Sequence, residues 1–98
     1  MEYDWDRRKR AANLAKHGLD LADAPIVFRG AVVEAPDDRR DYRERRIIAI
    51  GRLGGRLVTC VYTDRTKPEG REVRRVISLR PASRRERARY GDHTGAST

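Results

Sequence analysis

Two adjacent glycines near the middle of the chain constrain its fold more than any other feature. Gly54-Gly55 separates residues 45–51, which are rich in isoleucine, from residues 57–63, which are rich in Val, Thr and Tyr. Paired glycines readily adopt the positive φ angles of a tight turn, and the flanking compositions favour strands. The sequence therefore predicts an antiparallel hairpin that turns at residues 53–56.

A helix is expected ahead of this hairpin, over residues 7–17. This segment contains no Gly or Pro and is rich in alanine. Asp6 is suited to cap its first turn, and Gly18 is suited to the left-handed position that follows a helix. Its apolar stripe consists of Ala11, Leu14 and Ala15, which are expected to face the core.

The other elements are shorter. Asp20 is expected to cap a second helix that turns Leu21 and Ala24 inward, with Pro25 leaving its length open. Strands are expected at residues 2–5, 31–35 and 72–80, and Pro81 is expected to begin a final helix that ends near Tyr90.

The predicted fold class is α+β, with a single domain over residues 1–90 and a disordered tail over residues 91–98. It comprises a small antiparallel sheet of about four strands, two N-terminal helices and one C-terminal helix. The helices are expected to cover one face of the sheet and to leave the other free for a ligand.

The charge of the chain favours an anionic partner. Among 98 residues, 23 are Lys or Arg and 15 are Asp or Glu, which gives a net charge of +8. Such an excess promotes fast, salt-sensitive association with polyanions such as RNA. No apolar run is long enough to span a membrane and no secretory signal is visible, so a cytoplasmic location is expected.

Metal and disulfide chemistry is not expected. The single cysteine, Cys60, allows no intrachain disulfide and no cysteine metal cluster, and it is expected to be a small buried residue. The two histidines, His17 and His93, are too few for a spaced ligand set, and no P-loop or Rossmann glycine pattern is present. No cofactor is expected.

Lys9, Asn13 and His17 on the first predicted helix are spaced at i, i+4 and i+8, so they share one face. Together they are suited to grip a phosphate or to orient a substrate. In the alternative interpretation, which the residues alone favour, His17 simply ends the helix at the negative end of its dipole. Lys9 and Asn13 would then face solvent.

Alternation along the last predicted strand places Arg74, Ser78 and Arg80 on one face, opposite Val73 and Leu79. Two arginines flanking a serine form a candidate phosphate site. Arginines on an edge strand can also serve only to keep that edge soluble.

RNA cleavage needs a base for the ribose 2′-hydroxyl, cations for the phosphorane and an acid for the 5′-oxygen. Glu44 or His17 is a candidate for proton transfer, while Arg45 and Arg65 lie where the sheet can bring them near the last strand. Equally, Glu44 can be the ion-pair partner of a neighbouring arginine.

An ordered set of short motifs runs through the chain. It comprises Trp5-Asp6, Lys9, Asn13, Lys16-His17-Gly18, Leu21, Ala24, Asp37-Asp38, Tyr42, Glu44-Arg45, Gly51, Val61-Tyr62-Thr63, Arg65, Arg74, Ile77-Ser78, Arg80, Ala82, Glu86-Arg87 and Tyr90. This order and spacing resembles the BrnT toxin family of type II toxin–antitoxin systems. The resemblance covers roughly residues 3–90.

The resemblance implies a RelE-like fold and a ribonuclease activity that inhibits translation and growth. It also implies a BrnA antitoxin, similar to ribbon-helix-helix DNA-binding proteins, through which alone operator DNA is bound. The candidate catalytic residues are His17, Glu44, Arg45, Arg65 and Arg80, and the candidate substrate-binding residues are Lys9, Asn13, Arg74 and Ser78. Separate acid and base roles do not follow from the resemblance.

The chain departs from the usual family pattern at three positions. Arg7 stands where proline is common, Arg43 where glycine is common and Leu79 where alanine is usual. Leu79 is expected to face the core, so that change is expected to alter packing only.

Two main functional hypotheses follow from the sequence. The first is a metal-independent ribonuclease toxin that is neutralised by an antitoxin. The alternative is a non-catalytic basic module whose arginines only hold nucleic-acid phosphates. A third, weaker hypothesis is a protein-interaction domain without nucleic-acid affinity.

Overall fold

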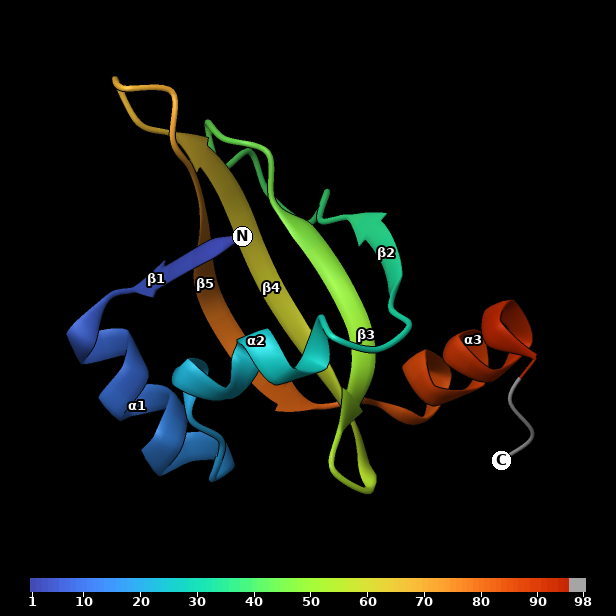
Figure 1. Ribbon diagram of the computed structural model, residues 1–98. Coiled ribbons are helices and arrows are strands. Elements are labelled where there is room, and N and C mark those ends of the chain that lie inside the picture. The colour runs from blue at the N-terminus through green and yellow to red at the C-terminus, as the bar shows by residue number, and fades with distance from the viewer. Residues whose placement is uncertain (96–98) are drawn as a thin grey trace.

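Five strands form one curved sheet in the order β1-β5-β4-β3-β2, as Figure 1 shows for the computed structural model. The structure describes residues 1–95. Its elements are β1 (Glu2–Trp5), α1 (Arg7–His17), the 3₁₀ turn η1 (Leu21–Asp23), α2 (Ala24–Val27), β2 (Val33–Pro36), β3 (Ile47–Leu53), β4 (Arg56–Thr66), β5 (Glu72–Pro81) and α3 (Arg84–Thr94).

The α+β class and the strand predicted at residues 2–5 are confirmed, but the sheet has five strands rather than about four and is not wholly antiparallel. β1 is a fifth strand, and it pairs in parallel with β5 from Glu2 opposite Val73 to Trp5 opposite Val76. The pairing joins segments about seventy positions apart, so no local sequence pattern specifies it.

The predicted hairpin is confirmed. β3 and β4 pair from Ile47 opposite Tyr62 to Leu53 opposite Arg56, and Gly54 has a φ of 62° in the two-residue turn. Gly51 serves a different purpose, because a Cβ atom there would lie 2.7 Å from Cγ1 of Val27. The missing side chain allows α2 to pack directly on β3.

Helix α1 has the predicted bounds and caps, but it exposes the opposite face. An Asp6 side-chain oxygen accepts a hydrogen bond from the backbone N–H of Lys9 at 3.0 Å, and Gly18 adopts a φ of 68°. Asn13 is buried, whereas Leu14 is 49% exposed. The expectation that the alanine–leucine stripe packs on the core is therefore wrong.

The buried amide of Asn13 joins α1 to β5. Its Nδ2 donates hydrogen bonds of 2.8 Å to the carbonyl oxygens of Leu19 and Leu79, and its Oδ1 accepts one of 3.1 Å from the N–H of Leu79. Strand β1 pairs with β5 only as far as Val76, so Asn13 binds backbone groups that no neighbouring strand reaches. This explains why the polar face of α1 points inward.

The main core lies between the sheet and the layer formed by α1, η1 and α2 (Figure 1). It consists of Leu19, Leu21, Ala24, Val27, Ala49, Val58, Cys60, Tyr62, Val76 and Leu79. Cys60 is fully buried as predicted, and burial raises the pKa of its thiol to about 12. Leu79 is also fully buried, which confirms that it is a packing residue.

A smaller cluster lies where α3 meets β2 and β3. It consists of Ile50, Ala82 and Tyr90, with the partly buried Val33 and Leu57. Ile50 follows Ala49 on β3, so strand alternation places it on the face away from the main core. The helices therefore do not all cover one face, as was expected.

The C-terminal helix begins later and ends later than predicted. Pro81 ends β5, and Ser83 caps α3 through a capping box in which its side chain and that of Glu86 each accept a hydrogen bond from the other's backbone N–H. The helix continues past Tyr90 to Thr94, which covers part of the predicted tail. Residues 96–98 of that tail lie outside the described residues.

We expect Asn13 to be a stabilising residue whose loss lowers the free energy of unfolding. Asn13→Ala leaves buried backbone groups of Leu79 and Leu19 without partners, which costs about 1–3 kcal/mol. Asn13→Asp is expected to cost more, because a carboxylate would face two carbonyl oxygens. Urea unfolding measures both effects.

The exposed Ala12 of the same helix provides the control for these variants. Ala12→Gln should change the free energy of unfolding by less than about 0.5 kcal/mol. Unchanged stability in Asn13→Asp would contradict the role assigned to the amide.

Candidate functional site

A β-bulge in β5 decides which face of the sheet each arginine of that strand occupies. Tyr62 on β4 pairs with Val76, whereas the preceding Val61 pairs with Ser78, so Ile77 is an extra residue without a partner. Directly paired residues point their side chains to the same face. Val76 and Ser78 therefore point to opposite faces, although they are two positions apart.

The bulge separates residues that were expected to act together. Arg74 pairs with Asp64 and shares the face of Tyr62, while Ser78 and Arg80 lie on the opposite face with Thr59. The predicted single face for Arg74, Ser78 and Arg80 is therefore wrong. Strand alternation alone could not show this, because it assumes an unbroken period of two.

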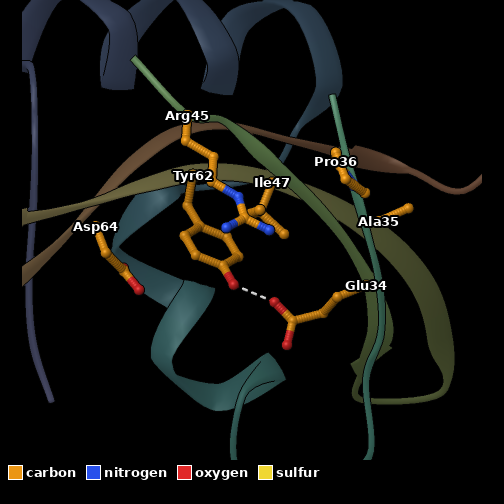
Figure 2. A pocket seen from close by; sticks show the side chains of 7 residues that line it. All are labelled: Glu34, Ala35, Pro36, Arg45, Ile47, Tyr62 and Asp64. Carbon is orange, nitrogen blue, oxygen red and sulfur yellow. Dashed lines mark hydrogen bonds between the residues drawn. The ribbon is translucent and has the colours of Figure 1, made fainter. Parts of the chain in front are cut away.

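A surface pocket of about 470 Å³ opens on the helix-covered face, beyond the end of the core. It lies where β2, β3 and β4 run side by side, and Figure 2 shows the side chains that surround it. The lining residues are Glu34, Ala35, Pro36, Arg45, Ile47, Tyr62 and Asp64. Its volume suits a small organic group, such as one nucleotide unit.

A tyrosine and a carboxylate are hydrogen-bonded across this pocket. The Tyr62 hydroxyl donates to a carboxylate oxygen of Glu34, as the dashed line in Figure 2 marks. Burial raises the pKa of Tyr62 above its ordinary value, and the hydrogen bond to Glu34 raises it further. The hydroxyl therefore keeps its proton at neutral pH and remains able to donate it.

Arg74 holds the other side of Tyr62 in place. Its guanidinium lies 4.1 Å from the Tyr62 ring centre and 4.6 Å from that of Phe28, and it binds Asp64 through two hydrogen bonds of 2.8 and 3.0 Å. Stacking and bidentate pairing fix this arginine in one position. Its charge is already matched, so Arg74 is suited to position Tyr62 rather than to bind a substrate.

Arg45 is the cation of the pocket that lacks a matched charge. Its side chain is exposed and extends from the loop just before β3 toward Tyr62 and Ile47 in Figure 2. Its carbonyl oxygen accepts a hydrogen bond of 2.7 Å from the Thr63 hydroxyl, which fixes the backbone there. Within residues 1–95, no carboxylate forms an ion pair with Arg45, so its guanidinium is available to an anion.

The Glu44 carboxylate forms ion pairs with Arg65 at 3.3 Å and Arg46 at 3.7 Å. Arg65 follows Asp64 on β4, so strand alternation directs it away from the pocket. The structure thus shows the ion-pair arrangement for Glu44 that the sequence had left open. A catalytic role for Glu44 and Arg65 stays a prediction.

Arg80 binds Glu86 through two hydrogen bonds of 2.7 and 2.9 Å. Burial alone would raise the pKa of Glu86, but the hydrogen bonds from Arg80 and from the Ser83 N–H lower it to about 2. Arg80 is therefore neutralised in this structure, and it links β5 to the start of α3. Ser78 lies on the same face and is partly buried.

The residues predicted on α1 do not line the pocket. Lys9 is exposed in the first turn of α1, and His17 is half-buried in its last turn. The two are eight positions apart, so their backbones lie about 12 Å apart along the helix. Asn13 lies between them and is committed to the backbone of Leu79 and Leu19. The structure thus brings together Arg45 and Arg74, but none of the three predicted residues of α1.

Arg43, one of the three departures from the usual family pattern, occupies a left-handed backbone position next to Glu44, with a φ of 58°. This conformation costs a residue with a side chain about 1–2 kcal/mol relative to glycine. A glycine at this position would avoid that cost.

Glu34, Tyr62 and Asp64 were not among the residues predicted for the site. They come from two strands and meet Arg45 only through the pairing of β2, β3 and β4. One local signal was present, because Tyr62 and Asp64 are two positions apart on a predicted strand and share a face. Glu34 carries no comparable signal.

The fold and pocket define a small basic α+β protein with a free arginine beside a tyrosine–carboxylate pair, an arrangement suited to a phosphate-containing ligand. A family sequence model described as "Ribonuclease toxin, BrnT, of type II toxin-antitoxin system" matches residues 5–86. The chain therefore belongs to the BrnT family of ribonuclease toxins, which confirms the resemblance. No curated protein sequence matches the chain.

Residues 1–95 hold no helix of the length and apolarity needed to cross a membrane. No three His, Cys, Asp or Glu residues of this range gather as a metal site.

We expect the Arg80–Glu86 pair to make stability depend on acid pH. The native pKa of Glu86, about 2, lies below the ordinary 4.5, so its contribution is complete above pH 4.5 and is lost as pH falls toward 2. Glu86→Gln should lower the free energy of unfolding by about 1–3 kcal/mol at pH 7. The deficit should shrink as the pH falls from about 4.5 toward 2.

Urea unfolding at several pH values measures this difference, and Arg87→Gln, at an exposed site on the same helix, provides the control. A deficit that stays constant from pH 7 to pH 2 would show that ionised Glu86 does not stabilise the fold.

Proposed function

We propose that this toxin cleaves RNA in the pocket between β2 and β4 without a metal ion. The observation that carries the proposal is that Arg45, which forms no ion pair within residues 1–95, lines the same pocket as the hydrogen-bonded Tyr62 and Glu34. These three side chains provide a cation, a proton donor and a proton acceptor.

The proposed reaction begins when Glu34 takes the proton of a ribose 2′-hydroxyl. The 2′-oxygen attacks phosphorus, the bond to the 5′-oxygen breaks, and Tyr62 gives its proton to that oxygen. Glu34 returns a proton to Tyr62 through their hydrogen bond, so both groups regain their starting states. The products are a 2′,3′-cyclic phosphate and a 5′-hydroxyl, and Arg45 stabilises the phosphorane charge.

Arg74 acts in this scheme as a positioning residue. Its contacts with the rings of Tyr62 and Phe28 hold the Tyr62 hydroxyl toward Glu34, and its pairing with Asp64 keeps it there. The adjacent guanidinium also favours negative charge developing on the tyrosine oxygen.

The opposite face of the sheet carries three other predicted residues, Arg65, Ser78 and Arg80, and Glu44 is the ion-pair partner of Arg65. There the observed carboxylates already neutralise the arginines. We therefore assign cleavage to the pocket. We propose that the opposite face guides the RNA backbone, and that RNA phosphates there replace the carboxylates as partners of the arginines.

Type II toxins pair with an antitoxin protein. We propose that the antitoxin of this chain is BrnA-like, with a ribbon-helix-helix fold, and that operator DNA is bound only through the complex. We further propose that the chain acts in the cytoplasm, that its fold is RelE-like and that RNA cleavage inhibits translation.

Cleavage of labelled RNA in EDTA tests the proposal. Arg45→Ala and Tyr62→Phe are each expected to lower the cleavage rate at least about 100-fold, because each removes a group that acts in the transition state. Tyr62→Phe keeps the ring against Arg74, so the fold should be retained by circular dichroism. Arg65→Ala should lower the rate less than about tenfold and mainly weaken binding.

Three results would contradict the proposal in different ways. Loss of cleavage in Arg65→Ala or Arg80→Ala, with Tyr62→Phe active, would place the reaction on the opposite face. Cleavage only after a divalent cation is added would disprove metal independence. Salt-sensitive RNA binding with no cleavage would favour the non-catalytic binding module.

A further inference from the structure

Helix α1 presents its apolar side to solvent. Ala11, Leu14 and Ala15 are exposed, whereas the buried side holds Asn13. A helix at the surface of a domain ordinarily turns its apolar stripe inward. The described part of the chain leaves this stripe uncovered, so we define Arg7, Ala11, Leu14 and Ala15 as the outer face of α1.

The charges around this outer face are unfavourable for the isolated chain. The first turn carries Arg7, Arg8, Lys9 and Arg10 at the positive end of the helix dipole, with no acidic residue among them. Arg10 is matched by Asp20, at 2.7 and 2.9 Å. Within residues 1–95, the side chains of Arg7, Arg8 and Lys9 have no ion-pair partner. A negatively charged binding partner would therefore reduce the electrostatic repulsion among these cations.

A second surface pocket, of about 310 Å³, lies on the same side of α1. It is lined by Arg7, Arg10, Ala11, Leu14 and Asp20. It thus combines two apolar side chains with three charged ones, and protein interfaces likewise surround an apolar anchor with polar contacts. The alanines allow another helix to approach closely.

We propose that the outer face of α1 binds an acidic amphipathic helix of the antitoxin. This inference rests on the proposed pairing with an antitoxin protein. Acidic side chains of the partner would meet Arg7 and Arg8, and an apolar side chain would enter the pocket beside Leu14. RNA fits this surface less well, because phosphates would use the cations but gain nothing from the apolar stripe.

The outer face of α1 is distant from the proposed cleavage pocket. α1 packs against β5 and η1, near one edge of the sheet, while the pocket involves β2 at the other edge (Figure 1). Variants of one surface should therefore leave the other intact, so that antitoxin binding and RNA cleavage are separable.

Leu14→Glu tests the proposal, with the full-length chain titrated against its cognate antitoxin by calorimetry. The new carboxylate would repel acidic side chains and disrupt the apolar contact, so affinity should fall at least about 100-fold. RNA cleavage in EDTA should be unchanged, and the antitoxin should no longer restore growth. Ala88→Glu, at an exposed site of α3, is the matched control and should bind normally.

Arg8→Glu provides a second variant, which should weaken the same complex and reduce its salt dependence. Wild-type antitoxin affinity in both variants would overturn the proposal. Normal antitoxin affinity with weakened RNA binding would show that RNA occupies this face instead. If the wild-type chain does not cleave RNA but Leu14→Glu still loses antitoxin affinity, only the proposed ribonuclease function is refuted. The proposed antitoxin surface would then stand.

Discussion

The hydrogen bonds between the Asn13 amide and the backbone of Leu79 determine how the N-terminal half of the molecule is arranged. β1 covers only the first part of β5, so the N–H and C=O of Leu79 would otherwise be buried without partners. The Asn13 amide, which carries both a donor and an acceptor, satisfies both groups. That requirement turns the polar side of α1 inward and leaves the apolar side, including Leu14, facing solvent.

The extra residue Ile77 has a comparable effect on the functional surfaces. By shifting the alternation of β5, it directs Arg74 toward Tyr62 and Asp64 and leaves Ser78 and Arg80 on the opposite face. One arginine therefore supports the pocket from within the aromatic cluster, while Arg80 anchors α3 through Glu86. Arg45 is exposed beside the pocket, where a phosphate can approach it.

The sequence predicted the features that depend on neighbouring residues. The β3–β4 hairpin, the caps of α1 and the burial of Cys60 and Leu79 all follow from local composition and turn chemistry. The capping box of Ser83 and Glu86 was also visible in the sequence, but Pro81 was mistaken for the start of the helix. The parallel pairing of β1 and the orientation of α1 depend on residues far apart in the chain.

The site was predictable to the same limited degree. Arg45 and Arg74 were both named as candidates. Arg45 lines the pocket, and Arg74 packs against the ring of Tyr62, which lines it as well. Glu34 joins Tyr62 only through the pairing of β2 with β3 and of β3 with β4, and the bulge at Ile77 has no marker in its own sequence. Arg80 was assigned to an open face because its partner Glu86 lies on an element whose position the sequence did not reveal.

We propose above that RNA binds in the pocket between β2 and β4, on the helix-covered face of the sheet. A nuclear magnetic resonance titration of the wild-type chain with a short 2′-O-methyl RNA, which cannot be cleaved through its 2′-oxygen, tests this most directly. We expect the largest amide shift changes at Glu34, Ile47 and Tyr62. Changes confined to Arg65, Arg75 and Ser78 would contradict it, because those residues lie on the opposite face.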